Sequence, residues 1–380
     1  MHVALVVERL AARGGGVERV AHRIARELSA RGDRVSVIAR EAEASDLPAG
    51  IEFVRVPAPR AWQPLRVALF SRAAQRAARR LRPDVVYSLA RAAGAQLYRA
   101  GAGCHPEYLD ALHGGPGRAL RRASPRHRAL ERLERQLLRD SRVRVQFTSA
   151  WVRDQFERRY GFARERGFVL PPAVDAEAFA AGERQAAAGP LWRARAGREL
   201  VWLFAGSGFR RKGLDLALAA LARGPARAEL WVAGRDEPGP WRRLAARLGL
   251  AQRVRFLGPV DDLAACYAVS DALLLPTRYD AFANVCLEAA AAGRPVVTSS
   301  RNGAAELLRE IGVATPEPED VAAFAAALDR LEDPRERERE GAACRALALR
   351  QRWDRQIAAL REELERAAAS ESALSRRSRS

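Results

Sequence analysis

Short apolar runs alternate with helical patterns along most of the chain, and this alternation constrains the fold more than any other feature. The first 175 residues contain seven runs with the length and composition of strands: 2–8, 34–40, 51–57, 84–90, 95–100, 143–150 and 167–175. Five more follow: 200–206, 228–234, 253–259, 271–277 and 294–300. Strands that alternate with helices are typical of parallel sheets covered by helices. We therefore predict an α/β fold built from doubly wound parallel sheets.

The length of 380 residues fits two domains of about 170 residues each better than one core. A polar, alanine-rich stretch near 176–190 reads as the linker between them. We predict one Rossmann-like domain over 1–175 and a second over 190–345. We expect a helix over 350–366 to pack back on the first domain, and a disordered tail over 367–380, which lacks an apolar period.

Cellular location is inferred from what the sequence lacks. No apolar run approaches the ~18 residues that cross a bilayer, and the N-terminus carries acidic Glu8 without a basic start, unlike a signal peptide. The four cysteines have neither CxxC spacing nor histidine partners, which favours reduced thiols. We expect a cytoplasmic protein without a structural metal.

Positive charge is concentrated in the first domain. The formal net charge is +19, and residues 1–175 hold 33 arginines against 18 acidic residues. A positive surface suits an anionic partner, which could be nucleic acid, anionic lipid or a phosphorylated saccharide. The alternative explanation of the charge is an arginine-rich genome. The segments 59–83 and 118–144 combine arginines with apolar residues, so they suit either an anionic membrane surface or ordinary inward packing.

The loop after the strand at 200–206 contains the only lysine of the chain, Lys212, in the stretch FRRKGL. Gly206 and Gly208 permit a tight turn, and the next helix begins close by. Backbone amides, a helix dipole and the side chains of Arg211 and Lys212 would then face a phosphate. The alternative is that Lys212 is a solvated surface residue.

A second loop follows the strand at 271–277 and carries two acids, Asp280 and Glu288, eight positions apart. Asp280 precedes a predicted helix and Glu288 lies two turns inside it, where carboxylates can accept hydrogen bonds from sugar hydroxyls. The first-turn amides of Ala283, Asn284 and Val285 can bind a second phosphate oxygen. We expect a gap of diphosphate size between this helix start and Lys212.

Taken together, these motifs resemble the retaining glycosyltransferases of the GT-B fold, family 4 type. The resemblance is carried by RRKG, by DAFANVCLEAAAAGRPVV, by Asn302-Gly303 with Glu306, and by GGGVERV near the N-terminus, so it spans nearly the whole chain. Within the family, YRAGAGCHPEYL and YDAFANVCLEA resemble the glucosyltransferases that add the first glucose to the heptose region of lipopolysaccharide core.

The resemblance implies a role for each matching position. Arg211 and Lys212 would hold the donor diphosphate, Glu288 the ribose hydroxyls, and Asp280, where relatives more often have Glu, the donor sugar. The remaining donor-binding positions that it implies are Gly14, Gly15, Gly16, Gly206, Gly234, Arg235, Phe282, Ala283, Asn284 and Val285. Among them, Gly234 and Arg235 would lie near the nucleotide base.

One departure concerns catalysis. Many relatives carry aspartate in the segment YRxGDG, where this chain has Ala102. The departing phosphate can itself accept the acceptor's proton in retaining transfer, and His105 in the same loop is a candidate to assist. A structural role is the alternative for this histidine.

These implications lead to one expected function with open alternatives. We expect transfer of a hexose, in particular glucose from UDP-glucose, to a glycolipid or phosphorylated saccharide acceptor such as the lipopolysaccharide inner core. The enzyme would need no metal and would bind peripherally to the anionic cytoplasmic face of the inner membrane, without nucleic acid. Mannosyl transfer from GDP-mannose, an inactive glycosyltransferase-like binding protein and a basic nucleic-acid binder are the alternatives.

Overall fold

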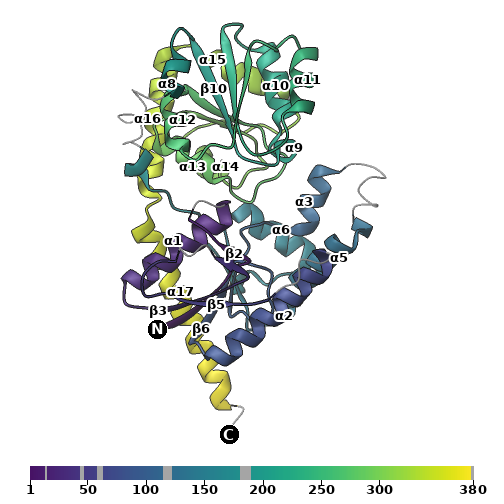
Figure 1. Cartoon of the computed structure of the whole chain (residues 1–380), viewed down its shortest axis with the longest axis vertical. Coiled ribbons are helices and arrows are strands. Elements are labelled where there is room, and N and C mark those ends of the chain that lie inside the picture. The colour runs from purple at the N-terminus through teal and green to yellow at the C-terminus, as the bar shows by residue number, and fades with distance from the viewer. Residues whose placement is uncertain (13–14, 43–46, 58–62, 114–121, 180–189, 378–380) are drawn as a thin grey trace. The chain divides into compact units, whose positions relative to one another are not determined.

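The computed structural model describes residues 1–12, 15–42, 47–57, 63–113, 122–179 and 190–377 (Figure 1). Its contacts divide the chain into two compact units. Unit 1 comprises Met1–Pro171 together with Asp354–Ser380, and unit 2 comprises Pro172–Trp353. Each unit is a parallel sheet with its own helices.

Unit 1 contains a seven-stranded parallel sheet in the order β5-β3-β1-β6-β7-β8-β9. The strands are β1 (His2–Val6), β3 (Arg34–Ala39), β5 (Glu52–Arg55), β6 (Val85–Ser88), β7 (Leu97–Arg99), β8 (Arg144–Phe147) and β9 (Gly167–Val169). All seven predicted strands are confirmed. A separate parallel pair joins β2 (Arg9–Leu10) to β4 (Glu41–Ala42).

The central strands are continuous apolar runs because both faces of the sheet are covered. Val3, Ala4 and Leu5 on β1 are fully buried. The helices of unit 1 are α1 (Gly16–Ala30), α2 (Gln63–Leu81), α3 (His105–Leu112), α5 (Pro125–Arg139), α6 (Ala150–Tyr160), the short η2 (Arg164–Arg166) and α17 (Trp353–Arg377). The basic helices α2 and α5 pack against each other, and Leu137 of α5 is buried. Inward packing thus accounts for part of the apolar pattern in both basic segments.

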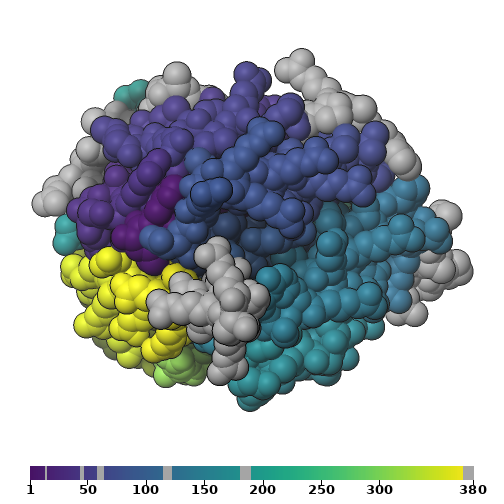
Figure 2. Space-filling view, turned by 90° about the horizontal axis from the view of Figure 1, so that it is seen from below, coloured from purple at the N-terminus to yellow at the C-terminus, as the bar shows by residue number. Residues whose placement is uncertain are grey.

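The C-terminal helix belongs to unit 1 and is longer than expected. It runs from Trp353 to Arg377, so the helix continues through most of the stretch predicted to be a disordered tail. Arg361 pairs with buried Asp33 at 2.9 Å, and Glu363 pairs with Arg144 of β8 at 2.7 Å. Figure 2 shows this helix in yellow beside the purple N-terminal segment.

Unit 2 contains a five-stranded parallel sheet in the order β12-β11-β10-β13-β14. The strands are β10 (Leu200–Ala205), β11 (Ala228–Ala233), β12 (Val254–Gly258), β13 (Ala272–Leu275) and β14 (Val296–Thr298), which confirms the five predicted. The strand order reverses between β10 and β13. Ligands of open parallel sheets bind outside the carboxyl ends of the strands at such a switch point, so the loops after β10 and β13 define the place to examine.

The helices of unit 2 cover both faces of this sheet (Figure 1). They are α8 (Pro190–Arg195), α9 (Phe209–Lys212), α10 (Leu214–Arg223), α11 (Gly239–Arg247), α12 (Leu263–Val269), α13 (Asn284–Ala291), α14 (Ala305–Glu310), α15 (Val321–Arg330) and α16 (Pro334–Arg350). Pairs α10 with α15 and α13 with α16 pack together. Among the described residues, no helix of either unit is long and apolar enough to cross a membrane.

A buried carboxylate organises the helical side of unit 1. Glu134 on α5 is fully buried and accepts hydrogen bonds from Arg91 at 2.8 Å, from Tyr160 at 2.7 Å and from the backbone of His105 at 3.0 Å. Arg91 also donates to the carbonyl of Gly103 at 3.1 Å. Glu134 therefore connects α5, α6 and the loop before α3.

We predict that Glu134→Gln lowers the free energy of unfolding of unit 1 by about 3 kcal/mol, because it leaves the Arg91 guanidinium buried without a counter-charge. Urea denaturation followed by circular dichroism measures this loss. The matched control is Glu131→Gln on the same helix, whose exposed pair with Arg135 contributes below about 0.5 kcal/mol. Equal stability of the two variants would contradict the assignment.

Candidate functional site

The loops after β10 and β13 are tied together by backbone contacts. The amide of Arg278 donates to the carbonyl of Arg211 at 2.8 Å, and the Thr277 hydroxyl donates to the same carbonyl at 3.1 Å. Gly213, which ends α9, has φ +77° and would place a Cβ 2.0 Å from the Pro276 carbonyl oxygen. Only glycine allows this approach, so α9 is held directly against the loop that carries Asp280.

Lys212 is buried in the resulting corner. Its side chain is 8% exposed, and a Cβ on Gly206 would lie 2.6 Å from its Cε. Gly206 has φ +122°, a conformation that L side chains rarely adopt. The predicted glycine turn thus lets the lysine stem pass close to the backbone, and the solvated-surface alternative for Lys212 is wrong.

Asp280 receives both cations of α9 on one oxygen. Its Oδ2 lies 2.7 Å from Nη1 of Arg211 and 3.1 Å from Nζ of Lys212. Burial alone would raise the pKa of Asp280, but the charges of Lys212 and Arg211 outweigh it and hold that pKa well below its ordinary value. The cluster therefore carries two positive charges against one negative charge, which leaves it net cationic.

This direct contact corrects one expectation. The sequence predicted a gap of diphosphate size between Lys212 and the helix start near Asp280, and the structure has an ion pair there instead. The reason is electrostatic, because a buried lysine needs a counter-charge close by.

Two sets of amides expected to face phosphate are already occupied. Asp236, in the loop after β11, accepts from the amides of Gly208 at 2.7 Å and Phe209 at 2.8 Å. Asn302 accepts from the amide of Ala283 at 3.0 Å. The carboxylate and the amide side chain satisfy donors that would otherwise be orphaned at these turns, so these amides are not open to a ligand as predicted.

Asn302 is a structural centre that sequence reasoning left without a role. Its side-chain oxygen also accepts from the amide of Ala304 at 3.1 Å, and its nitrogen donates to Thr298 Oγ1 at 3.0 Å. It also forms an isolated bridge with Asp280. The sequence shows the Asn-Gly motif after β14. Its structural role is the hydrogen bond that Asn302 accepts from the amide of Ala283 at the start of α13.

Glu288 lies on α13 and is 6% exposed. Tyr267 of α12 donates its hydroxyl to Glu288 Oε2 at 3.1 Å. Burial and the nearby Glu288 carboxylate raise the pKa of Tyr267 well above its ordinary value, so the phenol stays protonated as a donor. Sequence reasoning missed Tyr267, since no local spacing links it to Glu288. Phe282, Asn284 and Val285 occupy the connection between Asp280 and this part of α13.

The loop after β11 approaches the turn that begins α9. Gly234 would place a Cβ 2.5 Å from the carbonyl oxygen of Gly206 and 2.4 Å from the Phe209 ring, so the close packing there requires glycine. Arg235 is exposed, and its amide donates to Ser207 Oγ at 3.2 Å. A contact of either residue with a nucleotide base stays a prediction.

The remaining candidates belong to unit 1. Gly15 precedes α1 in an extended conformation and Gly16 begins the helix, whereas Gly14 lies outside the described residues. His105 begins α3, is 5% exposed, and has Nε2 3.1 Å from Nδ1 of His127. Burial, then the Arg91 charge, lowers the pKa of His105 to about 3. Its imidazole is therefore neutral at pH 7. Its hydrogen bonds with His127 and Glu134 give His105 a structural role, and a role in proton transfer stays a prediction.

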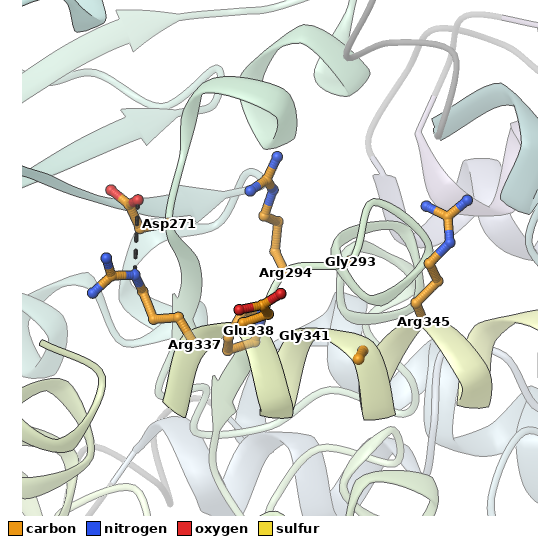
Figure 3. A pocket seen from close by; sticks show the side chains of 9 residues that line it. Asp271, Gly293, Arg294, Arg337, Glu338, Gly341 and Arg345 are labelled. Carbon is orange, nitrogen blue, oxygen red and sulfur yellow. Dashed lines mark ion pairs between the residues drawn. The ribbon is translucent and has the colours of Figure 1, made fainter. Parts of the chain in front are cut away.

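A separate pocket of about 390 Å³ lies in unit 2 between α16 and the turn before β14 (Figure 3). Asp271, Gly293, Arg294, Arg337 and Arg345 are among its lining residues. Asp271 and Gly293 precede β13 and β14, so this pocket lies at the amino edge of the sheet. It is opposite to the switch-point edge and belongs to a different site.

Comparisons with known proteins agree with this geometry. Residues 14–178 match the family described as Glycosyltransferase Family 4, and residues 199–333 match Glycosyl transferases group 1. A probable transglycosylase of Burkholderia thailandensis is 32% identical over 88% of each chain. The lipopolysaccharide glucosyltransferase WaaG of Escherichia coli K12 is 28% identical over 79% of this chain and 81% of that protein. The crystal structure of a WaaG superposes with a TM-score of 0.83 at 24% identity, covering 95% of this chain and 99% of that one.

The chain therefore belongs to the family 4 glycosyltransferases. It is a retaining glycosyltransferase, and the two parallel-sheet units have the GT-B fold that the sequence motifs implied.

The ion cluster predicts a specific pH dependence of stability. Because the folded-state pKa of Asp280 is depressed, its stabilisation is complete above the unfolded value of about 4 and is lost as the pH falls through the folded value. We expect Asp280→Asn to lower the free energy of unfolding of unit 2 by about 3 kcal/mol at pH 7, since two cations lose their partner. Urea titrations between pH 2 and 8 should show the difference shrinking only below about pH 4.

Asp329→Asn is the matched control, because Asp329 is an exposed acid on α15 of the same unit. It should change stability by less than about 0.5 kcal/mol at every pH. A difference between Asp280→Asn and the wild type that disappears well above pH 4 would refute the depressed pKa.

Proposed function

We propose that this glycosyltransferase transfers glucose from UDP-glucose to a glycolipid acceptor of the lipopolysaccharide inner-core type. The observation that carries the proposal is the net-cationic cluster of Arg211, Lys212 and Asp280 at the switch point of unit 2. A similar protein of E. coli is a lipopolysaccharide glucosyltransferase, and a structure with the same fold, HepE of Anabaena, contains UDP-glucose. Both similarities support glucose as the donated sugar, and the first supports the acceptor class.

In the donor site that we propose, Arg211 and Lys212 contact the diphosphate and neutralise the charge that develops on it as the leaving group departs. Glu288 accepts hydrogen bonds from the ribose hydroxyls, and its orientation is held by Tyr267. Asp280 has Oδ2 engaged by both cations, so its contact with the donor sugar would use the other oxygen, which accepts from the Phe282 amide at 3.3 Å. The Asn284 and Val285 amides, at the start of α13, would meet a second phosphate oxygen.

Retention follows if the acceptor attacks on the face from which the diphosphate leaves. The bond between the sugar C1 and the phosphate oxygen breaks, the acceptor oxygen bonds to C1, and the acceptor's proton passes to the departing phosphate. This route requires no carboxylate at Ala102. The cationic side chains supply the charge neutralisation that a divalent cation would otherwise provide, so we propose that transfer proceeds without metal.

On the acceptor side, we propose that basic surfaces of unit 1 meet an anionic glycolipid at the cytoplasmic face of the inner membrane. The segment around α2 supports this, because it has arginines without acids, and Leu65 on it is 46% exposed. Gly15 and Gly16 at the start of α1 would let the backbone approach the donor sugar. Mannosyl or other hexosyl transfer is the nearest alternative, and an inactive binding protein is the other.

The deciding experiment incubates the purified protein with a panel of labelled nucleotide sugars and extracted core lipids in EDTA, and reads products by mass. We expect one added hexose from UDP-glucose. Transfer from GDP-mannose instead would replace the donor assignment. Nucleotide binding without any transfer or donor hydrolysis would favour the inactive binding protein.

We predict that Lys212→Arg lowers the turnover number by about 10²- to 10³-fold, the cost of removing one preorganised donor to developing charge. The physical reason is space, because the lysine stem already passes close to Gly206 and a planar guanidinium needs more room. Steady-state kinetics measure the effect. Arg210→Lys, a change at an exposed position two residues earlier, is the control and should retain near-normal turnover; similar turnover for both would remove the special role of the lysine.

Glu288→Gln should weaken UDP binding about 10- to 100-fold, because a charge-assisted hydrogen bond contributes about 1.5–3 kcal/mol. Isothermal titration calorimetry with UDP measures it. Tyr267→Phe, which removes only the hydroxyl that orients Glu288, should cause a smaller loss. Unchanged UDP affinity in Glu288→Gln would exclude the ribose contact.

A further inference from the structure

Arg99 is a buried charge that the donor-site account does not use. It is the last residue of β7 and is 5% exposed. Two other cations described above, the mostly buried Arg91 and the buried Lys212, have carboxylate partners, Glu134 and Asp280 respectively. Within the described residues, Arg99 has neither an ion pair nor a hydrogen bond to its guanidinium.

The surroundings of Arg99 are polar, and no acid of the described part of the chain is paired with it. Tyr87 and Gln146 share its face of the sheet, as their registers with β7 place them, and Tyr87 donates its hydroxyl to Gln146 at 2.5 Å. Burial lowers the pKa of the Arg99 guanidinium, and the titratable groups that act on it electrostatically are the phenols of Tyr87, on the same face of the sheet, and of Tyr98, the preceding residue of β7. A guanidinium without a carboxylate in such a place costs folding free energy unless an anion compensates it.

The loop next to Arg99 carries no bulky side chains. Nη1 of Arg99 lies 2.1 Å from the point where a Cβ on Gly101 would be, so the guanidinium fills the space of the missing side chain. Gly101 is half-buried and Ala102 is exposed, and residues 100–103 contain only alanine and glycine. The charge therefore lies just beneath a small-residue loop at the carboxyl edge of the sheet, where ligands of parallel sheets bind.

We propose that Arg99 binds an anionic group, a phosphate or a carboxylate, on the acceptor saccharide. The proposal rests on the transferase function proposed above and names the acceptor chemistry within it. A planar guanidinium binds either oxyanion through two parallel hydrogen bonds. The small-residue loop lets such a group approach without displacing a side chain. Arg99 would thereby select acidic acceptors.

Two variants separate charge from position. Arg99→Met keeps an unbranched apolar stem and removes the charge, whereas Gly101→Ala keeps the charge and forces the guanidinium to move. Each should raise the KM for extracted core lipid about 10-fold or more, with hydrolysis of UDP-glucose in the absence of acceptor unchanged. Arg158→Gln, an exposed arginine on α6, is the control and should leave both values unchanged.

The source of the anion is read from the acceptor. If the group is a phosphate, phosphatase treatment of the core lipid should raise the wild-type KM to that of Arg99→Met; if it is a carboxylate, methyl esterification should do so. An unchanged KM in Arg99→Met, or in both treated acceptors, would overturn the proposal.

A stability measurement tests the proposal independently of activity. Without ligand, Arg99→Met should match or exceed the wild-type Tm, because an uncompensated buried charge is removed; a fall of several degrees would show a structural arginine and overturn the proposal. In a Lys212→Ala background, inorganic phosphate should raise Tm when Arg99 is present and not in Arg99→Met. An equal rise of Tm in both proteins would contradict the proposal for Arg99, whether or not the wild type is active. The transferase function itself would be refuted by a different result, namely that the wild type consumes no nucleotide sugar.

Discussion

The functional site depends on one pair of interactions, the ion pairs that the Asp280 carboxylate forms with Arg211 and Lys212. They join the loop after β10 to the loop after β13 at the point where the strand order of unit 2 reverses. The same contacts let a lysine be buried and keep a positive charge in excess. Among these three side chains, one carboxylate serves as the counter-charge for two cations, and this sharing stabilises the corner.

Around this cluster, the backbone amides of Gly208, Phe209 and Ala283 are used to build the site. Asp236 closes the turn before α9, and Asn302 closes the turn before α13. A rigid frame then presents side-chain cations at a fixed place, which reduces the reorganisation needed when charge develops on a leaving group. In the donor site that we propose, Arg211 and Lys212 largely take the role that glycine-rich backbone often has in phosphate sites.

The sequence predicts the twelve strands of the two large sheets and the loops that carry the site, since strand composition and the glycines around FRRKGL are local features. It does not predict the short pair β2 and β4. It does not predict Tyr267, Asp236 or the role of Asn302, because their partners are distant in the chain and are brought together only by the sheet order. The predicted gap beside Lys212 was wrong for a related reason: an isolated loop gives no sign that its cation already has a buried partner. The sequence did not predict the end of α17, because the apolar period of this stretch is weak. The earlier turns of the helix are fixed by ion pairs with Arg144 of β8 and with Asp33.

The most direct test of the central claim is a crystal structure of the protein with UDP bound in the absence of divalent metal. The account predicts diphosphate oxygens within about 3.2 Å of Lys212 Nζ and of the Arg211 guanidinium, with the Lys212–Asp280 ion pair retained and the ribose on Glu288. A diphosphate bound away from both cations, or a lysine that leaves Asp280 to reach it, would contradict the account.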